Sequence, residues 1–589
     1  MAPCFRGLGY GMLFTSKMTD IYYSMILAWC VFYLCNGFTS NLPWGTCEEE
    51  YNTYDCYRDT FQNDCDVEEP GTVYYNGTCT QAEDYCERHG FDGYDGSGIC
   101  TNSDDGVSES IVEVIKGAAI SPAEDYFDGF VLGVTKDATG ARYNMEDYGS
   151  IRWQLVLSLL GAWILITMVL VRGIASYGKA AYFITLSPYV ILTALIIYAA
   201  QLDGAIDGIK FYVNPDWDKL TELTVWAQAA SQILFSLSVG FGSQIILASY
   251  NKFSNNTFRD AVLISVCNSL TSIYAGFVVF SILGFLAVET NRDVEDVVTE
   301  GIKMAFVAYP SAVLEMDVPP LWSFLFFFML LNLALSSTCG SVENFIAFII
   351  DEWPSLRNHR VKVLLVFNFL SFLGGLPFCF EGGIYLFTIF DTRLVASLLI
   401  GVTLEMVLVG WVYGIRNFLD NLNEMGMDFR FSSYGWRKCT GYFLALMICI
   451  VTPGALIFLT IQAWVEFEGM SFEGKALKFL VNFSLVHSDM KLYLFESHLS
   501  ISMLGSNLYH FLNYSTKPSV LRLRLLFRVG GVRLVLGAHA DRNHVHVPGV
   551  PRRQTVVEAR AGGQDRVADD DFAQPFLARN RQVRRRRQE

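Results

Sequence analysis

The chain has 589 residues, of which 52% are hydrophobic and only 17% are charged. A soluble protein of this length carries more charge and fewer phenylalanines than the 45 found here, which excludes the soluble globular class. Apolar stretches of about 20 residues recur along the chain and predict an all-α polytopic membrane protein.

The apolar stretches predict nine membrane-spanning helices within a transporter domain of residues 1–474. Lys and Arg concentrate in alternate loops, and the intervening loops are acidic. The positive-inside rule therefore places loop 38–150 outside the cell. The predicted helices cover 12–37, 151–172, 180–201, 225–250 (broken), 260–289, 321–350, 361–380, 388–414 and 438–463.

The first predicted helix contains a carboxylate, Asp20. Carboxylates in spanning helices are costly and usually functional. Lys17 lies three residues earlier, so a local ion pair between the two side chains is the structural alternative. Both interpretations remain open at the level of sequence.

Loop 38–150 is rich in cysteine and acidic residues. Between Cys47 and Ser110 it carries 17 acidic residues and two arginines, which argues against nucleic acid as a partner. Its six cysteines predict three disulfides, with 15 pairings open. The sequon Asn76-Gly77-Thr78 lies on the same side of the membrane and predicts glycosylation at Asn76.

The predicted helix 225–250 is interrupted near its centre by Ser236, Ser238, Gly240 and Gly242. An unwound backbone in hydrocarbon must be satisfied by protein, water or a bound ion. A broken spanning helix is therefore a candidate binding site. The alternative is an intact Gly- and Ser-rich helix packed tightly against a neighbour.

Residues 475–589 form a divergent, arginine-rich segment that we expect to be disordered. Downstream of Lys517 there are 15 arginines and no lysines. The run Arg584–Arg587 suits anionic membrane lipid, although an incidental run of charge is the simpler interpretation.

Several sequence strings together resemble the neurotransmitter:sodium symporter family, from about Phe5 to about Gly469. The strings are Tyr22-Tyr23 before Ala28-Trp29, Leu42-Pro43-Trp44 before Cys47, GAIDGIKFY, SLSVGFG, SYNKF, AFVAYP and WVYG. The resemblance implies the inverted-repeat amino-acid/sodium symporter fold. The opening CFRGLGY resembles the end of the family's second helix. We therefore expect the chain to lack the counterparts of the first two helices, and of the twelfth.

The resemblance implies ion ligands on three of the predicted helices. The expected sodium ligands are Ser236, Asn268, the carbonyl of Leu333, Ser336 and Ser337. Many animal members have Asp where Ser336 stands, and backbone capping inside a helix is the alternative role for these serines. The expected chloride ligands are Gln232, Ser236, Asn268 and Ser272. No carboxylate replaces them, which favours chloride dependence.

The resemblance also implies a substrate pocket, gates and one disulfide. The expected substrate residues are Thr19, Tyr23, Phe235, Ser238, Phe241, Ser337 and Ser341. Asp391 would belong to the external gate, and Asp351 with Tyr250 to the internal gate. Cys47 and Cys56 match the family's external-loop disulfide, and the pairing of the other four loop cysteines stays open.

The function implied is sodium-coupled, chloride-dependent symport of an amino acid or amine neurotransmitter across the plasma membrane. Na+ and Cl− are the expected ions, and no enzymatic constellation is present. The expected partners are the small solute and membrane lipid, with homo-oligomerisation left open. The alternative is a truncated, non-transporting product or a gene-model fragment of such a transporter.

Overall fold

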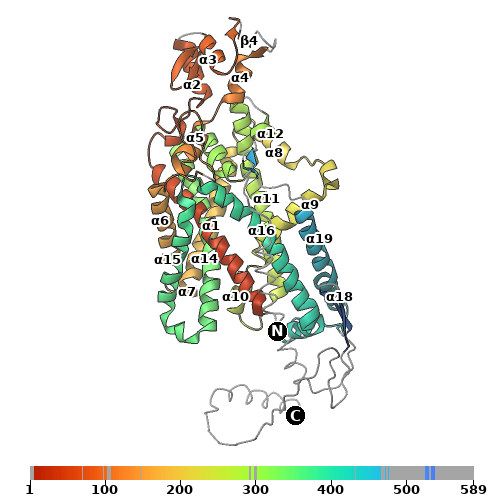
Figure 1. Cartoon of the computed structure of the whole chain (residues 1–589). Coiled ribbons are helices and arrows are strands. Elements are labelled where there is room, and N and C mark those ends of the chain that lie inside the picture. Colours follow the sequence, from red (N-terminus) through yellow and green to blue (C-terminus); the bar gives the residue numbers. More distant parts are fainter. Residues whose placement is uncertain are drawn as a thin grey trace, which may run out of the picture. The chain divides into compact units, whose positions relative to one another are not determined.

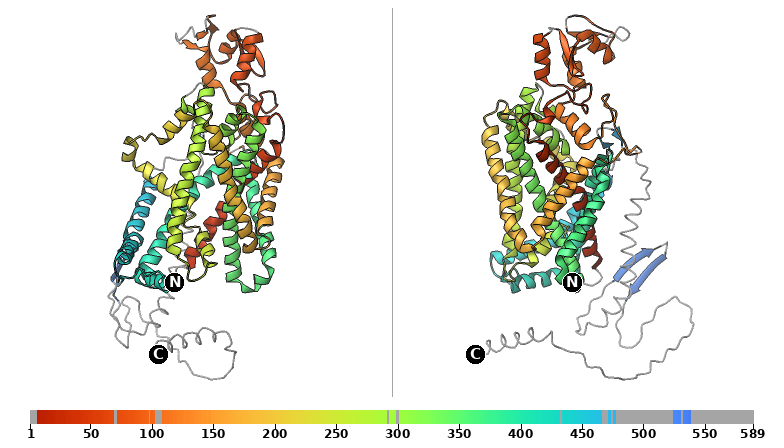
Figure 2. Two further views of the ribbon diagram at one scale, coloured as in Figure 1. Left: turned by 180° about the vertical axis from the view of Figure 1, so that it is seen from behind. Right: turned by 90° about the vertical axis from the view of Figure 1, so that its left-hand side faces the viewer.

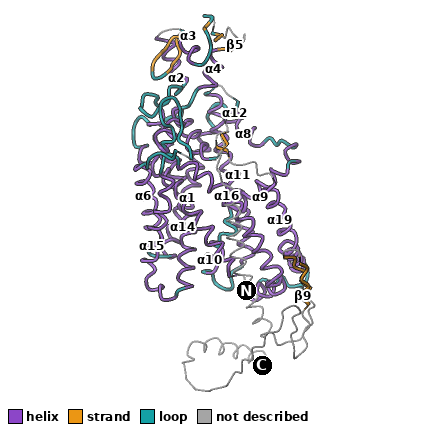
Figure 3. The backbone as a smooth tube through the Cα atoms, in the orientation of Figure 1, coloured by secondary structure: helices purple, strands orange, loops and turns teal. Residues whose placement is uncertain are grey.

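The computed structural model describes most of the chain up to residue 465 and short segments beyond it. The described residues are 6–68, 71–96, 98–101, 108–145, 147–290, 293–297, 301–431, 433–465, 471–472, 475–476, 524–529 and 532–537. The chain divides into two compact units, 1–511 and 512–589. The first unit is predominantly helical (Figure 3).

Eight helices in the described residues are long and apolar enough to cross a membrane. They are Arg6–Asn36, Trp153–Leu170, Ser176–Ala199, Thr257–Glu289, Pro319–Glu352, Pro354–Cys379, Leu398–Glu424 and Trp436–Ile461. Each overlaps one of the nine predicted helices. The ninth prediction, 225–250, corresponds to two shorter helices, α9 (Leu223–Ser236) and α10 (Ser243–Ser249).

Some predicted helix bounds differ from the observed ones. Helix α1 (Arg6–Asn36) begins six residues before the predicted start at residue 12. Helix α16 (Gly383–Val407) begins five residues before the predicted start at residue 388, and a π-helical segment follows it over Leu408–Gly414. Polar residues such as Arg6 continue a helix beyond the bilayer at no cost, so hydropathy alone underestimates its length.

Helix α1 packs against four helices of the first unit (Figure 1). They are α6 (Trp153–Leu170), α14 (Pro319–Glu352), α15 (Arg360–Gly375) and α16. Aromatic side chains fill the contact. Tyr33 stacks on Phe327 with ring centroids 4.4 Å apart, and Trp29 meets Phe306 edge-on at 5.6 Å. The α1–α14 contact matters most for the site, because both helices carry predicted substrate residues.

Three glycines bring α8 (Ala205–Val213) unusually close to α11 (Thr257–Glu289). A Cβ placed on Gly208 would come 1.9 Å from the carbonyl oxygen of Phe280, and one on Gly284 would come 2.5 Å from the carbonyl oxygen of Gly204. Larger residues are excluded here because they would collide with backbone atoms. The GAIDGIKFY string thus encodes a close helix–helix contact.

The cysteine-rich part of loop 38–150 forms a small disulfide-linked structure at one end of the helices (Figure 2). The bonds are Cys47–Cys56, Cys65–Cys79 and Cys86–Cys100. The first is the pair that the family resemblance implied, and the other two resolve the open pairing. The elements are α2 (Asp59–Glu68), β1 (Thr72–Tyr75), β2 (Thr78–Gln81), α3 (Ala82–Arg88), β3 (Gly93–Tyr94), β4 (Ile99–Thr101), β5 (Ser108–Ser110) and α4 (Ile111–Ala118).

The sequon lies in the turn of a β-hairpin. Strands β1 and β2 are antiparallel, with Tyr75 opposite Thr78. Asn76 and Gly77 form the two-residue connection with φ of 51° and 74°, and Asn76 is exposed. Asn-Gly favours this geometry because both residues tolerate positive φ. The acceptor side chain therefore lies on an accessible surface.

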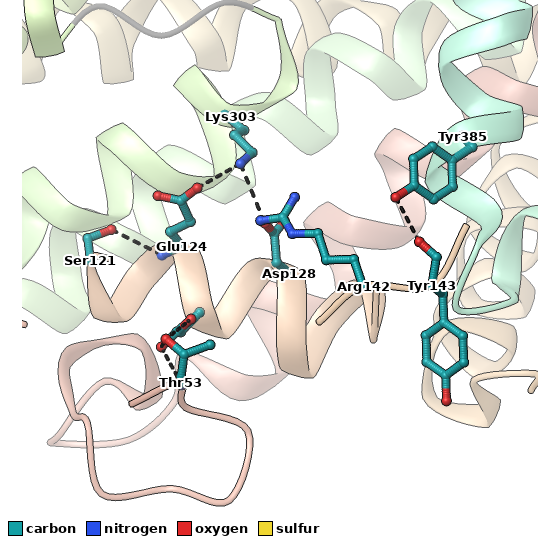
Figure 4. Close-up of polar contacts among 9 residues, drawn as sticks. Thr53, Ser121, Glu124, Asp128, Arg142, Tyr143, Lys303 and Tyr385 are labelled. Carbon is teal, nitrogen blue, oxygen red and sulfur yellow. Dashed lines mark hydrogen bonds and ion pairs between the residues drawn. The ribbon is translucent and has the colours of Figure 1, made fainter. Parts of the chain in front are cut away.

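Between the disulfide-linked structure and α6, a buried polar network connects distant parts of the chain (Figure 4). Asp128 lies in a π-helical segment (Tyr126–Leu132) that follows α5 (Pro122–Asp125). Its carboxylate accepts a hydrogen bond from Arg142 at 2.8 Å and lies 3.4 Å from Lys303 Nζ. Lys303 also contacts Glu124 at 2.7 Å. Burial raises the pKa of Asp128, and the two cations oppose that shift.

In the second unit the described residues form one antiparallel hairpin, β8 (Arg524–Val529) and β9 (Val532–Gly537). The apolar residues concentrated in RLLFRV and VRLVLG suit paired strands, and the expectation of disorder for 475–589 stays a prediction. A further pair, β6 (Ser471–Phe472) and β7 (Lys475–Ala476), belongs to the first unit. Residues 478–505 and the run Arg584–Arg587 lie outside the described residues.

Candidate functional site

The broken helix provides the framework of the candidate site. Helix α9 ends at Ser236, and α10 begins only at Ser243. Ser238, Gly240 and Gly242 have φ of 53°, 85° and 79°, in the left-handed region. These angles end the regular helical hydrogen bonding, so the segment between the two helices presents backbone carbonyls that a helix would use internally.

A buried amide holds part of this unwound segment. Asn344 on α14 donates from Nδ2 to the carbonyl oxygen of Phe241 at 2.9 Å. Its side chain is 5% exposed. Sequence reasoning missed Asn344, although it follows the predicted site residues Ser337 and Ser341 at helical spacing. That spacing placed all three on one face of α14 and could have revealed it.

Two predicted ion ligands from different helices meet directly. Ser236 Oγ at the end of α9 donates to Asn268 Oδ1 on α11 at 3.0 Å. Ser272, one turn further along α11, donates to the backbone carbonyl of Asn268 at 3.1 Å. Gln232 lies on α9 one turn before Ser236 and is exposed. Within the described part of the chain, no hydrogen bond joins Gln232 to the other three residues.

The predicted second set of sodium ligands lies on α14. Ser336 Oγ donates to the carbonyl oxygen of Leu333 at 2.8 Å, which is the intrahelical bond that backbone capping predicts. The same bond brings two predicted ligand oxygens together. The Ser336 carbonyl accepts a bond from Tyr177 on α7 (Ile174–Ala199) at 3.3 Å. Ser337 is exposed.

The predicted substrate residues form two groups. On α1 and α14, Ser341 and Ser16 share a hydrogen bond of 2.6 Å, and Thr19 donates to the Thr15 carbonyl at 3.0 Å. Tyr23 is half-buried on the same helix. Around the break, the rings of Phe235 and Phe241 meet edge-on with centroids 6.1 Å apart, on either side of Ser238.

The predicted gate residues lie in two different surroundings. The Asp391 carboxyl group lies beside the hydroxyl of Tyr22 on α1. Tyr250 lies within electrostatic range of Asp351, Glu343 and Arg360. Contact ion pairs at this end of the helices are Arg6–Glu352 and Arg360–Glu343. Sequence reasoning did not identify these four residues. Glu343, 1% exposed, is an acid within an apolar helix and could have drawn attention.

A helical membrane protein with one helix unwound at its centre, beside hydroxyl and amide oxygens from neighbouring helices, has the architecture of a secondary transporter. The sequence model described as the "Sodium:neurotransmitter symporter family" matches residues 1–96 and 96–490. The chain belongs to this family, and it is a multi-pass membrane protein.

Three relatives of the chain are named as sodium- and chloride-dependent transporters. The chain is 35% identical over 463 residues to the sodium- and chloride-dependent creatine transporter 1 of Homo sapiens, covering 78% of this chain and 65% of that one. It is 34% identical over 476 residues to the sodium- and chloride-dependent glycine transporter 2 of Xenopus laevis, covering 80% and 56%. The GABA transporter 2 of Rattus norvegicus is 34% identical over 430 residues, covering 72% and 63%.

The chain thus spans less than two thirds of the length of these relatives. These relatives are transporters, which agrees with the expectation that the chain is not an enzyme. Among solved structures, MhsT in complex with L-phenylalanine matches with a TM-score of 0.53 and 18% identity, covering 78% of this chain and 82% of that one. This likeness shows the shared fold.

Proposed function

We propose that the chain is a plasma-membrane symporter that couples the inward movement of Na+ to an amino acid or amine, with Cl− as a co-ion. The main support is the Ser236–Asn268 hydrogen bond at the break between α9 and α10. It places a hydroxyl and an amide next to unwound backbone, and these are the oxygen donors that a desolvated sodium ion accepts.

Chloride requires hydrogen-bond donors without a full negative charge beside them. Ser236, Ser272 and the amide group of Asn268 would supply such donors on α9 and α11, once the two hydroxyls turn from their present bonds to Asn268 toward the anion. The relatives named sodium- and chloride-dependent transporters support the same assignment. The second sodium ion would use the Leu333 carbonyl with Ser336 and Ser337.

The solute would bind between α1, α14 and the break, near Tyr23, Phe235, Phe241 and Ser341. Phe235 and Phe241 lie at the end of α9 and just before α10, so a change in the break would move both rings. Binding of ions and solute at shared elements is what couples their transport, because each ligand then stabilises the same conformation.

The test is uptake of a radiolabelled panel of amino acids and amines into cells that express the protein from its complete transcript. We expect accumulation that disappears when choline replaces Na+ and falls when gluconate replaces Cl−. Surface-expressed protein that binds no labelled solute and shows no sodium-dependent accumulation would instead support the non-transporting alternative. Sequencing of the transcript upstream of Met1 accompanies this comparison.

A further inference from the structure

A buried carboxylate on α1 has no role in the function proposed so far. Asp20 is 3% exposed, and its Oδ2 atom has no hydrogen-bond partner among the described residues. A carboxylate inside a membrane protein is costly unless a cation or several hydrogen-bond donors accompany it. An unpartnered oxygen of this kind is an acceptor for a ligand.

The neighbouring cation does not form a contact pair with Asp20. Lys17 lies one helical turn away and acts on the carboxylate electrostatically. Its ammonium group instead contacts the hydroxyl of Ser371 on α15 and lies 3.7 Å from the ring centroid of Phe367. The ion pairs found in the described part of the chain include neither Lys17 nor Asp20. Asp20 therefore keeps one carboxylate oxygen, Oδ2, without a hydrogen-bond donor.

The position of Asp20 connects it to the candidate solute site. The hydroxyl of Ser341, a predicted substrate residue on α14, lies within interaction range of the Asp20 carboxyl group. Ser341 also shares a hydrogen bond with Ser16, one turn before Asp20 on α1. Thr19 and Tyr23, at neighbouring positions on the helix, are the other predicted substrate residues of α1. Asp20 thus places a carboxylate beside the hydroxyl groups of Ser16, Thr19, Tyr23 and Ser341.

We propose that Asp20 binds a positively charged group of the transported solute, an ammonium or a guanidinium, and so selects cationic solutes over neutral ones of the same shape. This inference rests on the proposed symport function and names its substrate class. A cationic group would supply the hydrogen-bond donors and the charge that the Oδ2 atom lacks. Ser341 and Ser16 would hold the carboxylate in place.

The experiment measures binding to the purified full chain in detergent, without an ion gradient. Two matched pairs of labelled probes are used: L-arginine with L-citrulline, and tyramine with tyrosol. Each pair differs mainly by one positive charge. We expect at least one cationic probe to bind about tenfold or more tightly than its neutral partner, because a desolvated charge pair contributes that much to affinity.

Three variants identify the carboxylate as the cause. Asp20→Asn should reduce the preference to about threefold or less, whereas Asp20→Glu should retain it. Asp207→Asn, the same change on the exposed surface of α8, should leave it unaltered. If the unaltered chain binds the cationic and neutral probes equally well, the proposal is wrong. This measurement does not depend on whether the variants fold.

The remaining outcomes are equally decisive. A preference for the cationic probes that persists in Asp20→Asn would also overturn the proposal. So would an Asp20→Asn variant in which only the half-saturating Na+ concentration changes, and that result would assign Asp20 to Na+ binding. Because binding needs no gradient, retained cation preference together with failed accumulation would count against symport alone.

Discussion

Asn344 on α14 lies 2.9 Å from the carbonyl oxygen of Phe241 in the unwound segment. This single hydrogen bond joins the helix that carries Ser337 and Ser341 to the break between α9 and α10. A Cβ at Gly242 would come within 3.5 Å of the same side-chain amide. The Asn344 side chain therefore lies in van der Waals range of Gly242 as well as bonding to Phe241.

Replacement of Asn344 by alanine should impair transport more than fold. The Phe241 carbonyl would lose its donor in a buried environment, at a cost of about 1–3 kcal/mol. We expect sodium-dependent uptake per molecule at the cell surface to fall by about tenfold. Asn332→Ala is the matched control, because Asn332 is an equally buried amide on α14 that contacts Ser187 instead. Equal losses in both variants would contradict a specific role for Asn344.

The Ser236–Asn268 pair should act as a unit in sodium binding. Ser236→Ala and Asn268→Ala should each raise the half-saturating Na+ concentration for uptake. The double variant should be less impaired than the product of the two single effects, because either change already breaks the shared bond. A double-mutant cycle on the sodium dependence measures this coupling. Strictly multiplicative effects would show that the two residues act independently.

A carboxylate introduced at Ser272 should remove the need for chloride. Ser272 Oγ donates to the Asn268 carbonyl one turn from the Asn268 side chain, so a glutamate there would place a fixed negative charge where the anion is proposed to bind. We expect uptake by Ser272→Glu to persist when gluconate replaces Cl−. Ser269→Glu, at a serine whose hydroxyl donates to the Ser265 carbonyl and not to Asn268, serves as the control and should remain chloride-dependent.

Loss of the Cys86–Cys100 disulfide should destabilise the cysteine-rich structure and leave the membrane helices folded. Cys86 and Cys100 are fully buried with Val73 and Tyr85 in a small separate core. Replacing both cysteines by serine removes a bond across 14 residues, worth about 3 kcal/mol. Limited proteolysis should then cut within residues 59–118 much faster. Cys35→Ser, at an exposed free cysteine, should leave the rate unchanged.

Asp125 should make stability fall as pH rises through the weakly acidic range. Burial raises its pKa to about 6, although Thr53 donates to the carboxylate from both its backbone and hydroxyl groups. The folded state thus binds a proton more tightly than the unfolded state, so the free energy of unfolding decreases between pH 4 and 6 and levels off above about 6.

The measurement is the unfolding temperature of purified protein between pH 4 and 7.5. Asp125→Asn should have a flatter profile than the unaltered chain, because the titrating group is gone. Asp137→Asn, whose pKa is lowered by a hydrogen bond from Thr139, should not flatten it. Parallel profiles for Asp125→Asn and the unaltered chain would refute the assignment.

Hydropathy located the helices well because each spanning segment must satisfy its backbone internally. The break was also visible, since Ser238, Gly240 and Gly242 interrupt an otherwise apolar run. The helix bounds were less accurate: α1 begins in the more polar sequence around Arg6, and α16 begins five residues early within the apolar sequence GIYLF.

The sequence could not supply contacts between distant residues. Nothing in the local pattern around Asn344 identifies Phe241 as its partner, and Asp128 meets Lys303 only through the fold. The pairing of Cys65 with Cys79 and of Cys86 with Cys100 likewise depends on how α2, α3 and the strands of the loop pack together, which the spacing of the cysteines does not reveal. Nothing in the local pattern around Lys17 identifies its contact with Ser371, a residue 354 positions away.

The glycine contact between α8 and α11 has a mechanical consequence. The two backbones are in contact at Gly204, Gly208 and Gly284, and Tyr212 of α8 stacks on Phe280 of α11 with ring centroids 4.7 Å apart. We therefore expect α8 and α11 to move together as one rigid unit. A displacement of Asn268 on α11 would then also displace α8, so a reporter dye attached to an exposed residue of α8 should register ion occupancy at Asn268.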